Sequence, residues 1–338
     1  MKKRRQKGQV RHLRLRAALA AVGIVLVLAL AYRGGRWLET RNAKPEARGD
    51  AMQRLASQTV EVNGEPYRRR DELTTILLMG IDHASDAVVS GYRNGGQADF
   101  LRLIAIDPVA DTVSQLSIDR DTMTPITILG VLGNRSGVRT AQVSLSHGFG
   151  DGGAQSCELT VDAVSNLLLG TPIDFYVAMD LDGISVLNDM VGGVEVTLED
   201  DFSALDPAMT RGTTLTLVGD QAEYYVRNRL NIGVGTNESR MARQEEYLAA
   251  ISVLIDENVH ADKDFIGRLY DALEPYLTTN MTRGRLINEI WNARDYARTQ
   301  TASLPGTHQV GTDGFMQFYV DEAALEQTVL AQYYEKLK

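Results

Sequence analysis

Three apolar segments lie close together in this chain, at residues 76–82, 100–107 and 112–118. Their length and their content of Ile, Leu and Val are typical of buried or half-buried β-strands. The charged residues at or just after their ends are Asp82, Asp107, Asp119, Arg120 and Asp121. Because α/β folds bind ligands beyond the carboxyl ends of central strands, the pattern predicts a charged site at one edge of a sheet. The alternative for Arg120 and Asp121 is a solvated ion pair in a turn, which is the usual situation of such pairs.

The rest of the chain alternates between helical and strand patterns. Helices are predicted over residues 154–169, 181–190, 219–229, 240–258, 264–276 and 283–297. Strands are predicted over 173–179, 194–197, 213–217 and 315–320, with a hairpin-like turn at 108–111 and a polar, Gly-rich stretch at 129–153. In a chain of 338 residues, this alternation predicts one α/β domain with a mixed central sheet flanked by helices. We expect its main part at 73–258 and its C-terminal part at 259–338.

The first 33 residues predict a membrane anchor. Residues 1–16 carry eight Lys or Arg and no acid, although the net charge of the whole chain is −9. An uncharged apolar stretch follows, so we expect a basic cytoplasmic tip at 1–12 and a transmembrane helix at 13–33. The positive-inside rule then places the main domain outside the cell membrane, after a juxtamembrane stalk at 34–72. The alternative is a cleaved signal peptide ending at residues 29–31, which would export the same domain.

A second basic cluster interrupts the acidic remainder of the chain, which carries −17 once the eight N-terminal charges are set aside. It consists of Arg227, Arg229, Arg240 and Arg243, which fall within seventeen residues. Arg240 and Arg243 are three residues apart at a predicted helix start, so they project together. Planar guanidinium groups donate well to phosphate oxygens, and a helix N-terminus adds backbone donors. The alternative is a solvated helix face whose arginines pair with nearby glutamates.

Carboxylates near the strand ends are candidates for a cation site. Mg²⁺ binds one or two carboxylates and completes its octahedron with phosphate oxygens and water. Asp82 at one strand end and Asp99 just before the next strand fit this requirement, and Asp119 and Asp121 are further acidic candidates. The alternative is that Asp82 and Asp99 are turn carboxylates that bind no metal.

Several other classes of function lack support in the sequence. Residues 148–153 match the pattern G-x-G-x-x-G, but no apolar strand leads into them, as a dinucleotide site requires. Cys157 is the one cysteine, which excludes an intrachain disulfide, and we expect it to be a small apolar residue on a helix. The five histidines are scattered without zinc-site spacing. The acidic body does not suit nucleic acid.

Seven blocks of the sequence form an ordered set. They are Leu77–Asp82, Ala98–Phe100, Ser117–Thr122, Pro172–Val177, Val191–Val196, Tyr225–Arg229 and Arg240–Gln244. Together they resemble the LytR-CpsA-Psr family of membrane-anchored cell-envelope proteins, over about residues 73–258. Ser117–Thr122 is similar to the Ser-x-Pro-Arg-Asp-Thr signature of that family.

The resemblance implies transfer of a glycopolymer from a polyprenyl-pyrophosphate carrier to a hydroxyl of peptidoglycan, with a phosphodiester formed and polyprenyl phosphate released. It implies that Asp82 and Asp99 hold Mg²⁺ (or Mn²⁺). The residues implied to bind the pyrophosphate are Arg120, Arg227, Arg229, Arg240 and Arg243, with Gln244 assisting. We expect Asp121 to orient Arg120 or to accept the hydroxyl proton. The lipid tail is expected in an apolar pocket between sheet and helices, in a protein tethered to the bilayer.

Two residues depart from the family pattern, and two other functions stay open. Gln97 stands where the family usually has Arg, and Asp119 replaces the usual Pro. Both departures make the predicted site less positive. One alternative function is a non-catalytic scaffold or regulator, which would bind lipid-linked glycan without turnover. The other is a polyprenyl-pyrophosphate phosphatase, in which water replaces the sugar hydroxyl.

Overall fold

The computed structural model describes residues 59–83, 95–130, 133–227 and 237–337, with backbone alone at 237–241. Among these, residues 127–138 form a small compact unit, and the other described residues form the main unit. The small unit contains parts of strands β6 (Met123–Leu129) and β7 (Arg135–Gln142), which pair with each other. Inside it, the N–H of Gly130 donates to the carbonyl of Asn134 at 2.8 Å.

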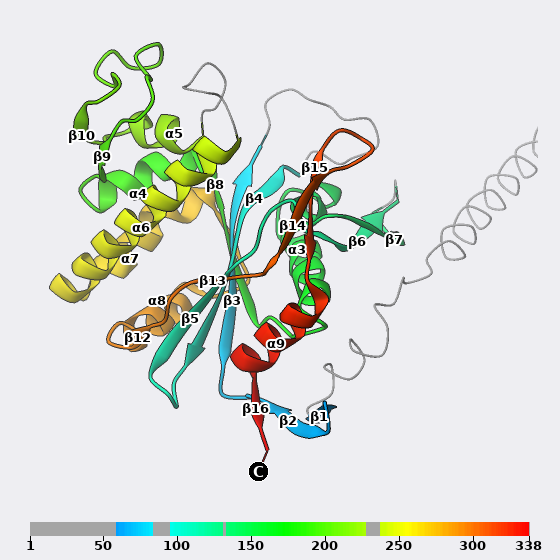
Figure 1. Ribbon diagram of the computed structural model, residues 1–338. Coiled ribbons are helices and arrows are strands. Elements are labelled where there is room, and N and C mark those ends of the chain that lie inside the picture. Colours follow the sequence, from blue (N-terminus) through cyan, green and yellow to red (C-terminus); the bar gives the residue numbers. More distant parts are fainter. Residues whose placement is uncertain (1–58, 84–94, 131–132, 228–236, 338) are drawn as a thin grey trace, which may run out of the picture. The chain divides into compact units, whose positions relative to one another are not determined.

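A mixed sheet forms the centre of the main unit (Figure 1). Among the described residues it has seven strands, in the order β11-β8-β3-β4-β5-β12, with β13 also paired to β5. Their bounds are Leu277–Thr279 (β11), Phe175–Asp180 (β8), Thr74–Asp82 (β3), Gln97–Asp107 (β4), Thr112–Ser117 (β5), Ala297–Arg298 (β12) and Ala302–Ser303 (β13). Strand β3 runs parallel to β8 and antiparallel to β4, which is antiparallel to β5. The predicted mixed central sheet is confirmed.

The two faces of β3 and β4 differ in burial. On one face, Leu77, Leu101 and Leu103 are at most 1 % exposed. On the other face, Leu78 and Ile104 remain half-buried. Since side chains alternate along a strand, the half-buried face of β3 is also the face of Asp82, four residues after Leu78. The face that carries Leu78 and Ile104, on which Ile76 and Ile106 are buried, therefore leads toward the predicted site.

The turn predicted at 108–111 is confirmed, and a buried carboxylate holds it. Oδ1 of Asp107 accepts two backbone N–H groups of the turn, each at 2.9 Å, and its Oδ2 lies 2.9 Å from Nη1 of Arg70. Because β4 is antiparallel to β3, Asp107 lies at the opposite end of the sheet from Asp82. The expectation that the charged strand ends share one edge is therefore wrong for Asp107, which stabilises a turn.

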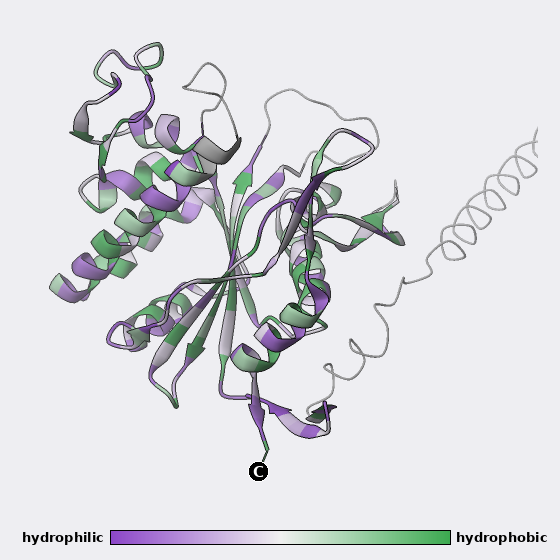
Figure 2. Ribbon diagram, in the orientation of Figure 1, coloured by the Kyte–Doolittle hydropathy of each residue, from purple (hydrophilic) through white to green (hydrophobic). Residues whose placement is uncertain are grey.

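Helices flank the sheet on both sides. Their bounds are Ala154–Leu167 (α3), Ile184–Met190 (α4), Asp220–Arg227 (α5), Asn237–Ala261 (α6), Phe265–Leu273 (α7), Arg283–Asn292 (α8) and Glu322–Tyr333 (α9). In Figure 1, α3 and α9 lie on one side and α4 to α8 on the other. Figure 2 shows both hydrophobic and hydrophilic residues around α6 and α7, as expected for helices with one buried face. The six predicted helices are observed, and α9 is an addition to them.

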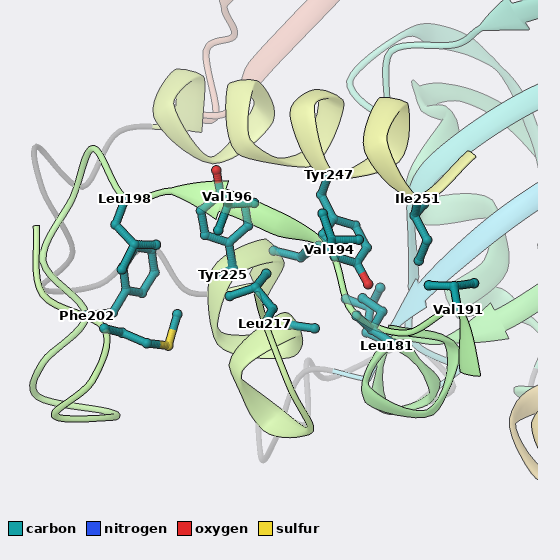
Figure 3. Packing of buried hydrophobic residues seen from close by; sticks show 14 of the residues in the cluster. Leu181, Val191, Val194, Val196, Leu198, Phe202, Leu217, Tyr225, Tyr247 and Ile251 are labelled. Carbon is teal, nitrogen blue, oxygen red and sulfur yellow. The ribbon is translucent and has the colours of Figure 1, made fainter. Parts of the chain in front are cut away.

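An apolar cluster fixes α5 and α6 against the segments around β9 (Glu195–Thr197) and β10 (Thr214–Thr216). Figure 3 shows Tyr225 of α5 and Tyr247 and Ile251 of α6 among its members. Leu217 and Val194 are 0 % exposed within it. Burial of each such aliphatic side chain contributes about 1.5–3 kcal/mol relative to exposure. This packing sets the position of the end of α5, where Arg227 lies.

Short elements lie outside the central sheet. Strands β1 (Thr59–Val62), β2 (Glu65–Arg69) and β16 (Tyr334–Lys336) form one small sheet, and β14 (Gly306–Val310) pairs with β15 (Met316–Val320). Strand pairing thus begins inside the stalk predicted at 34–72. The polar, Gly-rich stretch at 129–153 contains β7 and a 3-10 helix at Val143–Phe149.

No helix in the described parts of the chain is long and apolar enough to cross a membrane. The predicted basic tip at 1–12 and the predicted transmembrane helix at 13–33 lie outside the described residues.

Candidate functional site

Strands β3 and β4 bring two residues together at one edge of the sheet. Asp82, the last residue of β3, is paired in register with Gln97, the first residue of β4. Directly opposite residues on antiparallel strands point to the same face, with Cβ atoms about 4.5–5.5 Å apart. Because β4 is antiparallel to β5 as well, the loop that follows β5 and carries Arg120 reaches the same edge. The predicted site is therefore assembled from three strand ends.

A β-bulge adds Asp99 to this edge. Gly80 pairs with Phe100 and Ile81 pairs with Ala98, which leaves Asp99 as the extra residue of β4. Bulges redirect side chains and recur next to active sites. The Asp99 side chain is 8 % exposed, so its charge depends on a close partner.

That partner is Arg120, whose guanidinium group joins several site residues. Its Nη1 lies 2.5 Å from Oδ2 of Asp99, and its Nη2 donates to Oε1 of Gln97 at 2.7 Å. Its Nε lies 3.6 Å from Oδ1 of Asp121. The Arg120 side chain is 22 % exposed, so the fork is oriented yet still accessible. Gln97 acts here as an acceptor, a role that arginine in its place could not fill.

The loop of Arg120 is also held from within. Oδ1 of Asp119 accepts the N–H of Asp121 at 2.8 Å, and Oγ1 of Thr122 donates to the Asp119 carbonyl at 2.6 Å. Burial raises the pKa of the Asp121 carboxyl above its ordinary value, although Arg120 opposes this shift. A carboxylate with a raised pKa is a better proton acceptor near neutral pH.

Arg227, the last residue of α5, contacts Asp82. Its Nη2 lies 2.8 Å from Oδ1 of Asp82, and its Nη1 lies 2.8 Å from Oε1 of Glu223 and 3.2 Å from Oδ1 of Asp182. The Arg227 side chain is 28 % exposed. Glu223 and Asp182 were missed by the sequence reasoning. The spacing of Glu223, one helical turn before Arg227, is a readable signal for the pair.

Arg243, which the resemblance places in the pyrophosphate cluster, lies on α6, where it is buried and ion-paired. It is 6 % exposed, its Nε donates to the carbonyl of Tyr225 at 2.9 Å, and its Nη1 lies 2.8 Å from Oδ2 of Asp200. Its guanidinium group also lies 5.3 Å from the ring centroid of Phe202. Arg243 is thus a buried structural link between α6, α5 and the Asp200 segment.

The structure describes the other predicted pyrophosphate-binding residues of this part of the chain only in part. Nε2 of Gln244 donates to the carbonyl of Val226 at 3.3 Å, which ties it to the end of α5. Arg240 lies on α6, but its side chain is outside the described residues, as is Arg229 altogether.

Replacing Arg243 by alanine is expected to lower the free energy of unfolding by about 3 kcal/mol, because Asp200 then stays largely buried without its cation. Denaturant unfolding of the full-length chain in detergent measures this change. Arg268→Ala is the matched control, since Arg268 and its partner Asp262 are 54 % and 46 % exposed. It should cost less than about 1 kcal/mol. Equal losses in the two variants would contradict the structural role of Arg243.

Asp82 and Asp99 are the two carboxylates predicted to hold a divalent cation. Each has one oxygen in contact with an arginine, and a carboxylate has about four lone-pair positions to share. Within the described residues, no group of three or more His, Cys, Asp or Glu could hold a metal ion. Mg²⁺ needs only one or two protein carboxylates when phosphate oxygens and water supply the rest.

Comparison with known proteins now decides the family. Residues 39–333, most of the 338-residue chain, match the model of the LytR_cpsA_psr family. The chain belongs to the LytR-CpsA-Psr family. The resemblance inferred from the seven ordered blocks is confirmed.

Curated relatives of this LytR-CpsA-Psr protein carry the name polyisoprenyl-teichoic acid–peptidoglycan teichoic acid transferase TagU. The one from Bacillus cereus is 26 % identical over 256 residues, which cover 75 % of this chain and 76 % of the relative. The one from Halalkalibacterium halodurans is 31 % identical over 177 residues, which cover 52 % of this chain and 51 % of the relative. The named relatives are therefore transferases that act on teichoic acid and peptidoglycan.

Solved structures share the fold. Protein gbs0355 from Streptococcus agalactiae aligns with a TM-score of 0.60 at 22 % identity, covering 79 % of this chain and 91 % of that one. TagV from B. subtilis aligns with a TM-score of 0.53 at 23 % identity, covering 78 % and 97 %. TagT bound to LI-WTA aligns with a TM-score of 0.55 at 20 % identity, covering 77 % and 90 %.

Proposed function

We propose that this LytR-CpsA-Psr protein transfers a glycopolymer from a polyprenyl-pyrophosphate carrier to a sugar hydroxyl of peptidoglycan. The observation that carries this proposal is the pair of arginines, Arg120 and Arg227, on either side of the paired residues Asp82 and Gln97. Both guanidinium groups are oriented by carboxylates and remain partly exposed. Preorganised forks of this kind suit the oxygens of a pyrophosphate. The names of the TagU relatives support the same chemistry.

In the proposed step, the acceptor hydroxyl oxygen attacks the phosphorus nearer the glycan. A new P–O bond forms, the bond from this phosphorus to the bridging oxygen breaks, and the electron pair leaves with polyprenyl phosphate. The hydroxyl proton passes to Asp121, whose pKa is raised by burial. The product is a phosphodiester between glycan and peptidoglycan. Phosphoryl transfer of this type depends on positioning and charge neutralisation more than on a special nucleophile.

Each residue of the site has a proposed role in this step. Arg120 and Arg227 bind non-bridging phosphate oxygens, and Gln97 and Asp99 keep the Arg120 fork in place. By the family resemblance, Arg229, Arg240 and Gln244 complete the pyrophosphate site. Mg²⁺ or Mn²⁺ held by Asp82 and Asp99 would neutralise charge on the phosphate oxygens as a Lewis acid.

The half-buried face of the sheet is proposed to hold the lipid tail. Leu78, Ile104, Phe175 and Val177 are partly buried there and pack against a small apolar cluster on the same face. Leu78 is paired in register with Val177. This apolar surface shares its face of β3 with Asp82, so a lipid seated on it has its pyrophosphate end at the arginines. The lining could not be named from the sequence.

The location of the protein is part of the proposal. We propose that residues 13–33 anchor the chain in the cell membrane, with the N-terminal tip in the cytoplasm and the catalytic domain outside. A polyprenyl carrier resides in the bilayer, so a tethered enzyme meets it at a raised effective concentration.

The test uses the full-length chain in lipid nanodiscs with a polyprenyl-pyrophosphate-linked glycan, peptidoglycan fragments and Mg²⁺. Mass spectrometry follows release of polyprenyl phosphate and attachment of glycan to peptidoglycan. Equal amounts of the two products are expected. Carrier release without attachment would support the phosphatase instead. Binding of the lipid-linked glycan without either product would support a scaffold. The departures at Gln97 and Asp119 are the observation in favour of that function.

A further inference from the structure

One carboxylate connects the Arg120 loop to a hairpin far along the chain. Oδ1 of Asp119 accepts the N–H of Asp121 at 2.8 Å, whereas its Oδ2 lies 2.8 Å from Nε2 of His308 on β14, 189 residues later. An ionised carboxylate only accepts hydrogen bonds, so Nε2 of His308 is the donor. The Asp119 side chain is 16 % exposed and that of His308 is 48 % exposed. Both oxygens of Asp119 are thus engaged, one by the loop and one by the hairpin.

Backbone contacts fix the same hairpin on the same loop. The N–H of Phe318, on β15, donates to the carbonyl of Asp121 at 2.8 Å, and Phe318 forms a parallel bridge with Thr122. His308 and Phe318 are directly paired across the hairpin, with ring centroids 4.6 Å apart. Phe318 is 7 % exposed. Phe318 therefore anchors the hairpin, and this anchor directs the imidazole of His308 toward Asp119.

Asp119 directly precedes Arg120, so its charge and orientation matter for an anion site. With His308 in place, the carboxylate is held by a donor on the side of the hairpin. Without that donor, Oδ2 of Asp119 loses its hydrogen bond while Oδ1 keeps the N–H of Asp121, and the carboxylate charge, next in sequence to Arg120, is stabilised by fewer donors. Like charge near a phosphate disfavours its binding, and loss of preorganisation costs most where charge develops in the transition state.

We propose that His308 is a positioning residue for Arg120, acting through Asp119. The inference rests on the proposed function, since it assigns His308 a part in the same site. His308→Ala is expected to lower kcat about tenfold and to raise KM about threefold. His308→Gln keeps an N–H donor for Asp119, so it should lose less than about threefold in kcat.

A double variant separates positioning from folding. In Asp119→Asn/His308→Ala, the asparagine oxygen still accepts the N–H of Asp121, and no carboxylate remains to be compensated. This variant should regain most of the kcat lost in His308→Ala, whereas a loosened hairpin would not be repaired by a change at residue 119. Phe318→Ala, which removes the buried anchor, should lower the melting temperature without being rescued by Asp119→Asn.

The experiment measures kcat and KM in the transfer assay with full-length protein, and the Kd of inorganic pyrophosphate by calorimetry in the same variants. A threefold weaker Kd in His308→Ala that is restored in the double variant supports the proposal, even if wild-type protein shows no transfer. Absence of transfer in wild type would count against the proposed function alone. Unchanged kinetics and Kd in His308→Ala, or no recovery in the double variant, would overturn the role of His308.

Discussion

Replacing Arg120 by alanine is expected to lower the rate of glycan attachment by about 100- to 1,000-fold, the usual cost of removing one preorganised donor from a charge-stabilising site. Arg120 is the residue through which Asp99, Gln97 and Asp121 are connected at 2.5, 2.7 and 3.6 Å. Its loss removes the guanidinium fork proposed to bind phosphate and the ion pair with Asp99. Mass spectrometry of the peptidoglycan-linked product, with the full-length chain, measures the effect.

Two control variants make this result specific. Arg120→Lys keeps the charge, but a single ammonium group cannot contact Asp99 and Gln97 as a planar fork does, so an intermediate rate is expected. Arg268→Ala removes an exposed arginine of α7 from its ion pair with Asp262 and should leave the rate unchanged. If Arg120→Ala attached glycan at the wild-type rate and kept the wild-type melting temperature, the result would show that the reaction occurs at another site.

Replacing Asp82 by asparagine is expected to lower the transfer rate by about a hundredfold and to weaken its dependence on Mg²⁺. The variant replaces the carboxylate proposed to hold Mg²⁺ by a neutral amide and removes the charge that orients Arg227, at 2.8 Å. Rates are measured over a range of Mg²⁺ concentrations after treatment with EDTA, which should abolish wild-type transfer until Mg²⁺ is returned. Binding of Mn²⁺, followed by electron paramagnetic resonance, gives a readout independent of turnover.

Asp182→Asn is the matched control for Asp82. Asp182 also contacts Arg227, at 3.2 Å, but its side chain is 70 % exposed. Solvent screens such a charge, so the rate should change by less than about twofold. If the two asparagine variants behaved alike, or if Asp82→Asn bound Mn²⁺ as wild type does, Asp82 would not be a metal ligand.

The central strands were predictable because their signal is local. β3, β4 and β5 are apolar runs with a turn between the last two, and each falls where the pattern places it. The hairpin partner β14 has no such signal, since all five of its residues are exposed. It forms because β15 anchors it through Phe318. For α9 the sequence does contain a signal, which was missed. Asp321 is an N-cap residue, and its side chain accepts two backbone N–H groups at 3.0 Å each.

The composition of the site was more predictable than its geometry. The ordered blocks identify Asp82, Asp99, Arg120 and Arg227, and the structure brings these into two adjoining ion-pair clusters. The bulge at Asp99 depends on strand register, which no apolar pattern encodes. The contact of Arg243 with Asp200 was not predictable, because a helical arginine has the same sequence spacing whether it faces a phosphate or a buried carboxylate.

The pairing of β16 with β2 has a consequence for how the protein is made. A ribosome delivers β1 and β2 early, but their third strand lies at Tyr334–Lys336, and the hairpin that contacts the Arg120 loop lies at residues 306–320. Closing such long loops is slow compared with forming local contacts. A nascent chain that has not yet delivered residues 306–336 therefore contains Arg120 and Arg227 without the hairpin that contacts the Arg120 loop and without the strand that pairs with β2. The ordered position of the Arg120 loop therefore depends on contacts that can form only after residues 306–320 have been delivered.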